Sequence, residues 1–145
     1  MSRWVRWAAV AVLVSLGAVA GASPSASADP GLTLSASSAN LGSGRTTVTL
    51  TGQYSCGPFA SGVPDRGVID LTVVQAKGRR TVTAYGYLEP TVCDGTDQPF
   101  AATLTVTGTT LFQKGAATWS ASGYVEGDTG LQHVTVPPTP ITLTR

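Results

Sequence analysis

The strongest constraint on this chain is a strict alternation of apolar and polar side chains, repeated in short segments between turn residues. In residues 46–56, Val48, Leu50 and Tyr54 share one parity and threonines fill most of the other. A two-residue period places the two sets on opposite faces of a β-strand. Clusters of Gly, Pro, Asp and Ser separate the segments, which is typical of sandwiches and barrels. The sequence therefore predicts an all-β domain.

We expect seven or eight strands, the best fit being an immunoglobulin-like antiparallel β-sandwich and the alternative a small Greek-key barrel. Thr107-Gly108-Thr109 forms either a bulge or a turn. Prolines 137, 138 and 140 cannot occupy a central ladder, so the last strand lies at an edge or changes sheets. The expected strands are Leu32–Ala36, Thr46–Cys56, Val68–Ala76, Arg80–Glu89, Phe100–Val106, Ala116–Val125 and a last strand from Gln132.

Residues 1–28 have the features of a cleaved secretory signal peptide, which leaves 29–145 as a single β-sandwich domain. Arg3 and Arg6 precede an apolar run at Ala8–Ala20, and residues 26–28 fit the small-x-small cleavage rule. Cleavage after Ala20 is the alternative. The run is shorter than the ~20 apolar residues that span a bilayer. We expect a secreted, extracellular protein with no membrane span.

Composition excludes several classes of function. The net charge of +1 gives no electrostatic footprint for nucleic-acid binding. One His and two Cys are too few for a protein zinc site, and we expect no cofactor. His133 is the only imidazole and no Gly-x-Ser-x-Gly elbow is present, so we expect no enzyme. An acid/base pair of Asp94 and Asp97 stays open as an alternative.

The two cysteines fall at the same end of the predicted domain. If strands run alternately up and down, Cys56 ends the second strand and Cys93 follows the fourth. This placement supports a disulfide, which stabilises by about 4 kcal/mol in the chain-entropy account. No Cys-x-x-Cys spacing indicates a redox role.

The same strand count separates the charges into two ends. Only Arg66 departs from the separation. The basic end is a candidate for binding anionic cell-wall polymer, acidic glycans or lipid headgroups, with Lys77, Arg79 and Arg80 as its densest part. The alternative is that these charges keep hairpin tips soluble and protect strand edges. One end collects Asp29, Asp65, Asp70, Glu89, Asp94, Asp97, Glu126 and Asp128, and the other collects Arg45, Lys77, Arg79, Arg80, Lys114 and Arg145.

Two further groups of residues are candidate sites. Tyr85 and Tyr87 share one face of the fourth strand, where they form either a glycan-stacking platform or ordinary half-buried packing. Trp119 and Tyr54 sit on faces with small or apolar neighbours and are predicted core residues. No metal is expected; the weak calcium candidate is a set of carboxylates that equally suits turns, Asp94, Asp97, Glu126 and Asp128.

Segments 47–56, 92–95 and 112–116 resemble small secreted actinobacterial proteins that form a domain-of-unknown-function family and are predicted to be immunoglobulin-like. The resemblance implies a Cys56–Cys93 pair and carries no functional residue. A more distant similarity is to the apoproteins of enediyne chromoproteins, which have two disulfides where this chain has material for one. Secreted protease inhibitors are also similar in kind, but no reactive-site motif is present.

Taken together, these patterns predict a secreted, monomeric, non-catalytic binding or envelope-associated module whose partner is an extracellular ligand. Weak binding of anionic cell-wall polymer through the basic end is the expected activity. The alternative is a small secreted inhibitor or small-molecule carrier.

Overall fold

The structure is a computed structural model that describes residues 31–145; the predicted signal peptide and Asp29 lie outside these residues. The described part is all-β and contains seven strands. No helix in it is long and apolar enough to cross a membrane. The all-β prediction is confirmed. The strands are β1 (Thr33–Leu41), β2 (Thr47–Ser55), β3 (Arg66–Lys77), β4 (Arg80–Leu88), β5 (Gln98–Val106), β6 (Gly115–Gly127) and β7 (Gly130–Thr144).

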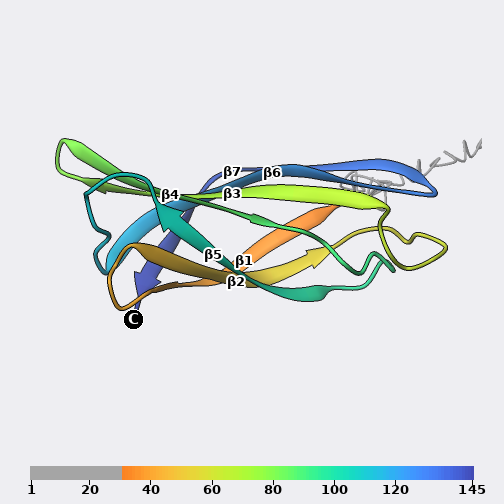
Figure 1. The fold of residues 1–145 in the computed structure, drawn as a ribbon, viewed down its shortest axis with the longest axis horizontal. Helices are drawn as coiled ribbons and strands as arrows, with labels where there is room; N and C mark the ends of the chain where they lie inside the picture. The colour runs from red at the N-terminus through yellow and green to blue at the C-terminus, as the bar shows by residue number, and fades with distance from the viewer. Residues whose placement is uncertain (1–30) are drawn as a thin grey trace, which may run out of the picture.

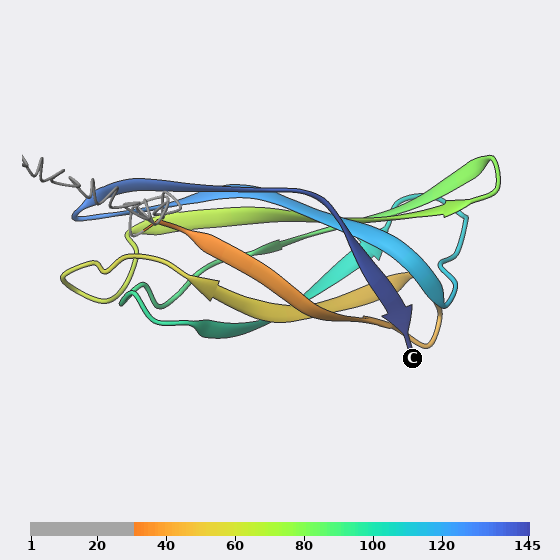
Figure 2. The same cartoon turned by 180° about the vertical axis from the view of Figure 1, so that it is seen from behind.

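The seven strands close into a small barrel in the order β1-β2-β5-β4-β3-β6-β7. Every neighbouring pair is antiparallel except β1 and β7, which are parallel where the barrel closes. All strands follow the long axis of the molecule, so their connections gather at its two ends (Figures 1 and 2). The predicted alternation of strand direction therefore holds along the whole described chain.

Two pairs of neighbouring strands share far fewer paired residues than the other strand pairs do. β4 pairs with β5 only through Ala84↔Val106 and Tyr85↔Thr105. β1 pairs with β7 only through Ala39↔Leu143 and Asn40↔Thr144. These two seams separate a layer of β1, β2 and β5 from a layer of β4, β3, β6 and β7, and Figure 1 shows the layers facing each other.

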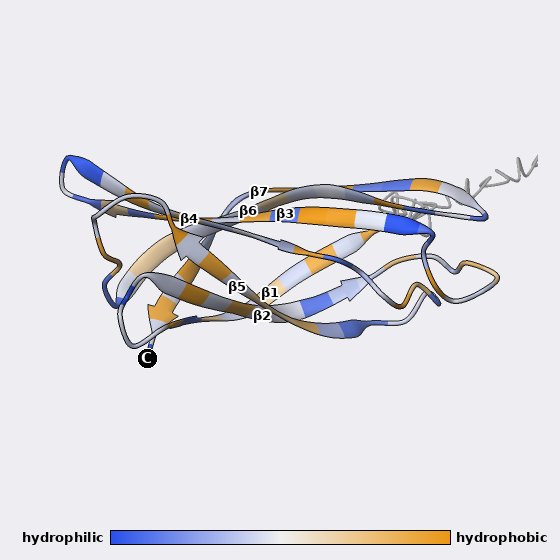
Figure 3. Ribbon diagram, in the orientation of Figure 1, coloured by the Kyte–Doolittle hydropathy of each residue, from blue (hydrophilic) through white to orange (hydrophobic). Residues whose placement is uncertain are grey.

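The core lies between the layers and uses the parity that the sequence predicts. Val48, Leu50 and Tyr54 of β2 are buried, whereas the threonines between them are partly exposed. Trp119 on β6 is 4% exposed, so its predicted core position is confirmed. Hydrophilic residues gather at the hairpin tips and apolar residues along the strands, as Figure 3 shows.

The prolines of β7 interrupt its ladder with β6. The β6–β7 register shifts between Trp119 and Ala121, opposite the segment that contains Pro137 and Pro138. β6 remains the partner of β7 on both sides of this shift, and β1 joins only at Leu143 and Thr144. Figure 2 shows β7 bending across the barrel toward its end. The prolines therefore lie where β6 is the one strand that pairs with β7, which agrees with the prediction of an edge and not with a change of sheets.

Residues 107–114 form the connection from β5 to β6, which decides between the bulge and the turn predicted for Thr107-Gly108-Thr109. Gly108 has a backbone φ of 107°. Residues with a side chain rarely adopt this conformation, and it suits a turn. The connection contains no additional strand, so β6 starts at the end where β5 stops. The charge separation is thereby preserved beyond residue 107.

At the end of the barrel opposite the 107–114 connection, a disulfide cross-links Cys56 and Cys93. Backbone bonds reinforce it: Gly95 N donates to the Cys56 carbonyl at 2.8 Å, and Cys93 N donates to the Gly62 carbonyl at 2.8 Å. The hydroxyl of buried Tyr54 accepts from the backbone N–H of Thr91 at 3.2 Å. The segment after β2 and the segment before β5 therefore form one unit.

Replacing both cysteines, Cys56→Ala with Cys93→Ala, is expected to lower the free energy of unfolding by about 2–4 kcal/mol, because the unfolded chain loses its cross-link. Urea denaturation of the variant and the oxidised parent measures the difference. Reduced parent protein is the control and should match the variant. Equal stability of variant and oxidised parent, within about 0.5 kcal/mol, would contradict the expectation.

Candidate functional site

The structure brings the six basic candidates together at one end of the barrel. Lys77 and Arg80 face each other across the β3–β4 hairpin, with Arg79 in its turn. The Arg45 carbonyl accepts from Phe112 N at 3.2 Å, which joins the β1–β2 turn to the 107–114 connection. Lys114 directly precedes Gly115, which pairs with Leu143 near the C-terminal residue Arg145. Four separate segments thus supply one basic end, defined as Arg45, Lys77, Arg79, Arg80, Lys114 and Arg145.

The described carboxylates lie away from this basic end. Asp65 N donates to the Glu126 carbonyl, which links the start of β3 to the end of β6. Glu89, Asp94 and Asp97 belong to the β4–β5 connection, and Asp128 to the β6–β7 hairpin. Arg66 lies at this acidic end, as predicted, and forms a salt bridge with Glu126. Asp70 lies within β3 and not in a connection at this end.

No carboxylate neutralises the basic end within residues 31–145. The salt bridge of Arg66 with Glu126 is the one ion pair in this part of the chain. Arg79, Arg80 and Lys114 are exposed. Six cationic side chains therefore produce a local positive potential in a protein whose formal net charge is only +1.

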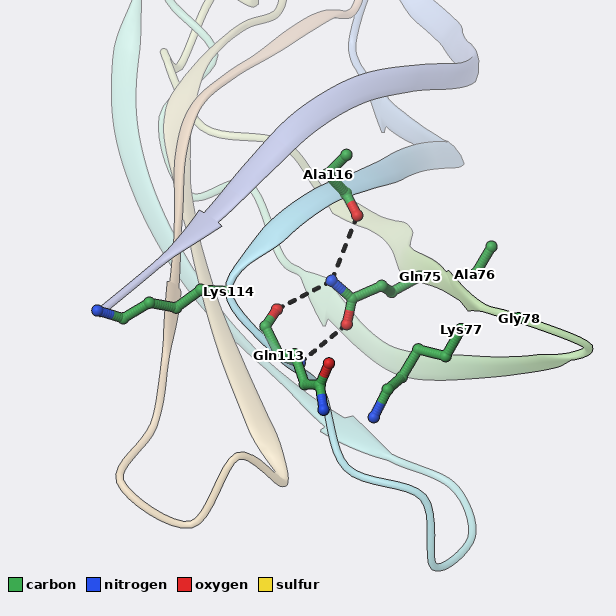
Figure 4. Close-up of a pocket in the computed structure, with 7 residues that line it drawn as sticks. All are labelled: Gln75, Ala76, Lys77, Gly78, Gln113, Lys114 and Ala116. Carbon is green, nitrogen blue, oxygen red and sulfur yellow. Dashed lines mark hydrogen bonds between the residues drawn. The ribbon is translucent and has the colours of Figure 1, made fainter.

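A buried amide holds the basic end in shape (Figure 4). Gln75 is 4% exposed and is the only buried polar side chain of the described residues. Its Nε2 donates to the carbonyls of Gln113 at 2.9 Å and Ala116 at 3.3 Å, and its Oε1 accepts from Gln113 N at 2.9 Å. Lys77 Nζ adds a bond to the Leu111 carbonyl at 3.0 Å. The β5–β6 connection is thereby tied to β3.

An open hollow of about 580 Å³ lies at this site, and its lining includes Gln75, Lys77, Gln113, Lys114 and Ala116. Figure 4 shows the side chains of Lys77 and Lys114 extending in different directions from its two sides. The two ammonium groups are therefore not arranged to enclose one small anion. Charges spread over an open surface suit an extended polyanion, which contacts several cations in turn.

Tyr85 and Tyr87 lie on the outer face of β4 and are 54% and 64% exposed, so each residue is partly packed and partly accessible. They line a second open hollow of about 620 Å³ along the β4–β5 seam. Its other lining residues are small or polar: Asp70, Gly86, Ala101, Ala102, Thr103 and Thr105.

Three of the four carboxylates of the calcium candidate have partners within the fold. Asp94 Oδ1 accepts from Thr96 N at 2.9 Å and Thr96 Oγ1 at 2.6 Å, which closes a turn. Asp128 accepts from Ala60 N at 2.9 Å, and Glu126 pairs with Arg66. Asp97 is exposed, and residues 31–145 contain no group of three metal-ligating side chains.

His133 also has a structural environment. It lies opposite Tyr124 in the β6–β7 pairing, and the two ring centroids are 6.4 Å apart. Both rings line a small hollow together with Arg66, Glu126 and Leu131. The imidazole thus packs at the acidic end of the barrel.

Comparison with known proteins finds no matching family model, no matching curated protein and no matching solved structure.

Sequence reasoning found the basic end but missed the buried amide that organises it. The signal was present, because Gln75 continues the parity of Ile69, Leu71 and Val73, all of which are buried. A glutamine at a core-facing position needs hydrogen-bond partners. Its partners could not be foreseen, since they belong to a connection 38 residues away in the chain.

The variant Gln75→Leu is expected to lower the free energy of unfolding by about 1–3 kcal/mol, because it removes the partners of backbone groups on residues 113 and 116. It should also speed amide hydrogen exchange at Gln113. The matched control is Gln113→Ala, which keeps every backbone bond and should change stability by less than about 0.5 kcal/mol. Equal effects of the two variants would contradict the role given to Gln75.

The stability contributed by the hydrogen bonds to the Asp94 carboxylate is expected to depend on pH. The hydroxyl of Thr96, followed by its backbone N–H, donates to the carboxylate and holds the pKa of Asp94 below its ordinary value of 3.8. The resulting stability is complete above that ordinary pKa and is lost as the pH falls through the lower folded pKa. In Thr96→Val the carboxyl of Asp94 should titrate at higher pH, as followed by NMR. An unchanged titration midpoint would exclude the hydroxyl as the main cause.

Proposed function

We propose that this domain is a secreted, monomeric, non-catalytic immunoglobulin-like module that binds an anionic cell-envelope polymer through its basic end. The observation that carries the proposal is the gathering of six cationic side chains from four segments, with no carboxylate partner among residues 31–145. Attraction of this kind is long-ranged and additive over charges, so it suits a polymer with many negative groups.

The fold supports the immunoglobulin-like part of the proposal. The layer of β1, β2 and β5 faces a layer containing β3, β6 and β7, which matches the pairing of first, second and fifth strands against third, sixth and seventh in that fold. The fourth strand joins β3 across most of its length. The disulfide departs from the antibody pattern, since it links β2 to the β4–β5 connection instead of joining the two sheets.

Two observations support export. The Cys56–Cys93 disulfide is compatible with an oxidising compartment, where such bonds persist. Residues 1–28 carry the predicted signal peptide. Together they support an extracellular place of action, where anionic wall polymers and glycans are exposed.

The rigidity of the basic end favours binding over mere solubility. Gln75 and Lys77 fix the β5–β6 connection against β3, which holds the backbone beside Lys114 and the ammonium group of Lys77 in place before a ligand arrives. Charges that serve only to keep a hairpin tip in solution do not need a buried anchor. Pre-organisation of this kind lowers the ordering cost of association.

Removing three exposed cations, with Arg79→Ala, Arg80→Ala and Lys114→Ala combined, is expected to abolish retention on isolated cell envelopes at low salt. Lys77 is left in place because its Nζ also bonds the Leu111 carbonyl. Parent protein should be retained at about 0.05 M NaCl and released near 1 M, where the screening length falls to about 3 Å. Sedimentation of envelopes, followed by assay of the supernatant, measures both.

Two variants control for loss of the fold and for charge alone. Arg79→Lys with Arg80→Lys keeps the charge and should keep retention, whereas Arg66→Ala removes a cation at the acidic end and should have no effect. Polyphosphate-coated beads and anionic lipid vesicles separate a polymer from a membrane surface as the ligand. Absence of retention by the parent protein, or retention on vesicles alone, would reject the proposal.

A further inference from the structure

The second hollow, along the β4–β5 seam, carries a different chemistry from the basic end. It begins where the two strands stop pairing, just beyond Tyr85↔Thr105. Two tyrosine rings border it, and its floor is made of small side chains and backbone. We propose that this groove, defined as Asp70, Tyr85, Gly86, Tyr87, Ala101 and Thr103, binds an uncharged polysaccharide chain.

The tyrosines have the exposure of a stacking platform. They are separated by one residue on β4, so they point to the same side about 7 Å apart along the strand. Both rings are more than half exposed, which leaves aromatic surface available for the apolar faces of sugars.

The neighbours of the tyrosines keep the rings uncovered. Across the sheet, Tyr85 lies opposite Thr72 and Thr105, and Tyr87 lies opposite Asp70. None of these side chains is large enough to cover an aromatic face. Gly86 between them brings β4 close to β5, because a Cβ there would lie 2.8 Å from the Thr103 carbonyl. The seam therefore forms a shallow groove that admits a flat chain.

The polar groups of the groove favour a neutral polyol over an acidic ligand. Asp70 is exposed, and its carboxylate has no ion-pair partner within residues 31–145. It accepts hydrogen bonds, and the hydroxyl of Thr103 both donates and accepts them. A lone carboxylate repels an acidic ligand, whereas sugar hydroxyls donate to it. The groove therefore suits a neutral polyol better than the anionic ligand proposed for the basic end.

The test is binding of the full chain to four insoluble neutral polysaccharides: cellulose, chitin, curdlan and a β-mannan. Depletion from solution is measured at about 0.1 M and about 1 M NaCl, since a neutral ligand gives the same affinity at both. We expect retention on at least one polymer. Tyr87→Ala should weaken it roughly tenfold, and Tyr85→Ala with Tyr87→Ala should abolish it.

Matched variants separate recognition from folding. Leu131→Ala truncates a side chain of similar exposure, 53%, at another hollow and should bind as the parent does. Tyr87→Phe keeps the ring and should stay within about threefold of the parent. Circular dichroism shows whether the double tyrosine variant is folded. If it is unfolded, the Asp70→Ala variant replaces it in the binding assay and should also bind more weakly than the parent.

Three results would overturn the proposal: no retention on any of the four polymers, equal retention of parent and double tyrosine variant, or release by salt. The variant lacking Arg79, Arg80 and Lys114 should keep full polysaccharide binding, because those residues lie at the basic end and not in the groove. Loss of polysaccharide binding in that variant would assign the activity to the basic end and reject the groove as its site.

Discussion

Reversal of direction at every strand is the constraint from which the rest of the molecule follows. Because each of the seven strands runs opposite to the one before it, alternate connections must meet at the same end of the barrel. One end thereby receives the disulfide and the carboxylates, and the other receives the cations. A chain of nearly balanced composition acquires two ends of opposite sign without any large local excess of charge in its sequence.

The sequence predicted those features that depend on parity alone. Alternation in residues 46–56 identified the buried side of β2, and the strand count placed Cys56 and Cys93 at the same end of the domain. The closure of the sheet, the pairing of β3 with β6 and the narrow β4–β5 seam were not predictable. Pairings between strands distant in the chain depend on how side chains from both layers fill the core, and local periodicity carries no information on that.

The two proposed binding surfaces follow from two different irregularities in the barrel. At the basic end, a long connection replaces a tight turn, and Gln75 holds it against β3. Along the seam, the ladder between β4 and β5 ends after two residue pairs, and Tyr85 and Tyr87 are exposed beside it. One surface offers cations and the other offers aromatic rings with a carboxylate, so together they suit an envelope in which charged and neutral polymers are mixed.

The Gln75 anchor contacts only backbone atoms of the connection it holds. Its three bonds can therefore be made whatever side chain stands at 113 or 116, provided that residue 113 is not proline. Substitutions in the connection can alter its charge or size while its path stays fixed. The arrangement separates the residue on which the path of the connection depends from the side chains that are free to vary, so this end of the barrel tolerates substitution at 113 and 116 at little cost in stability.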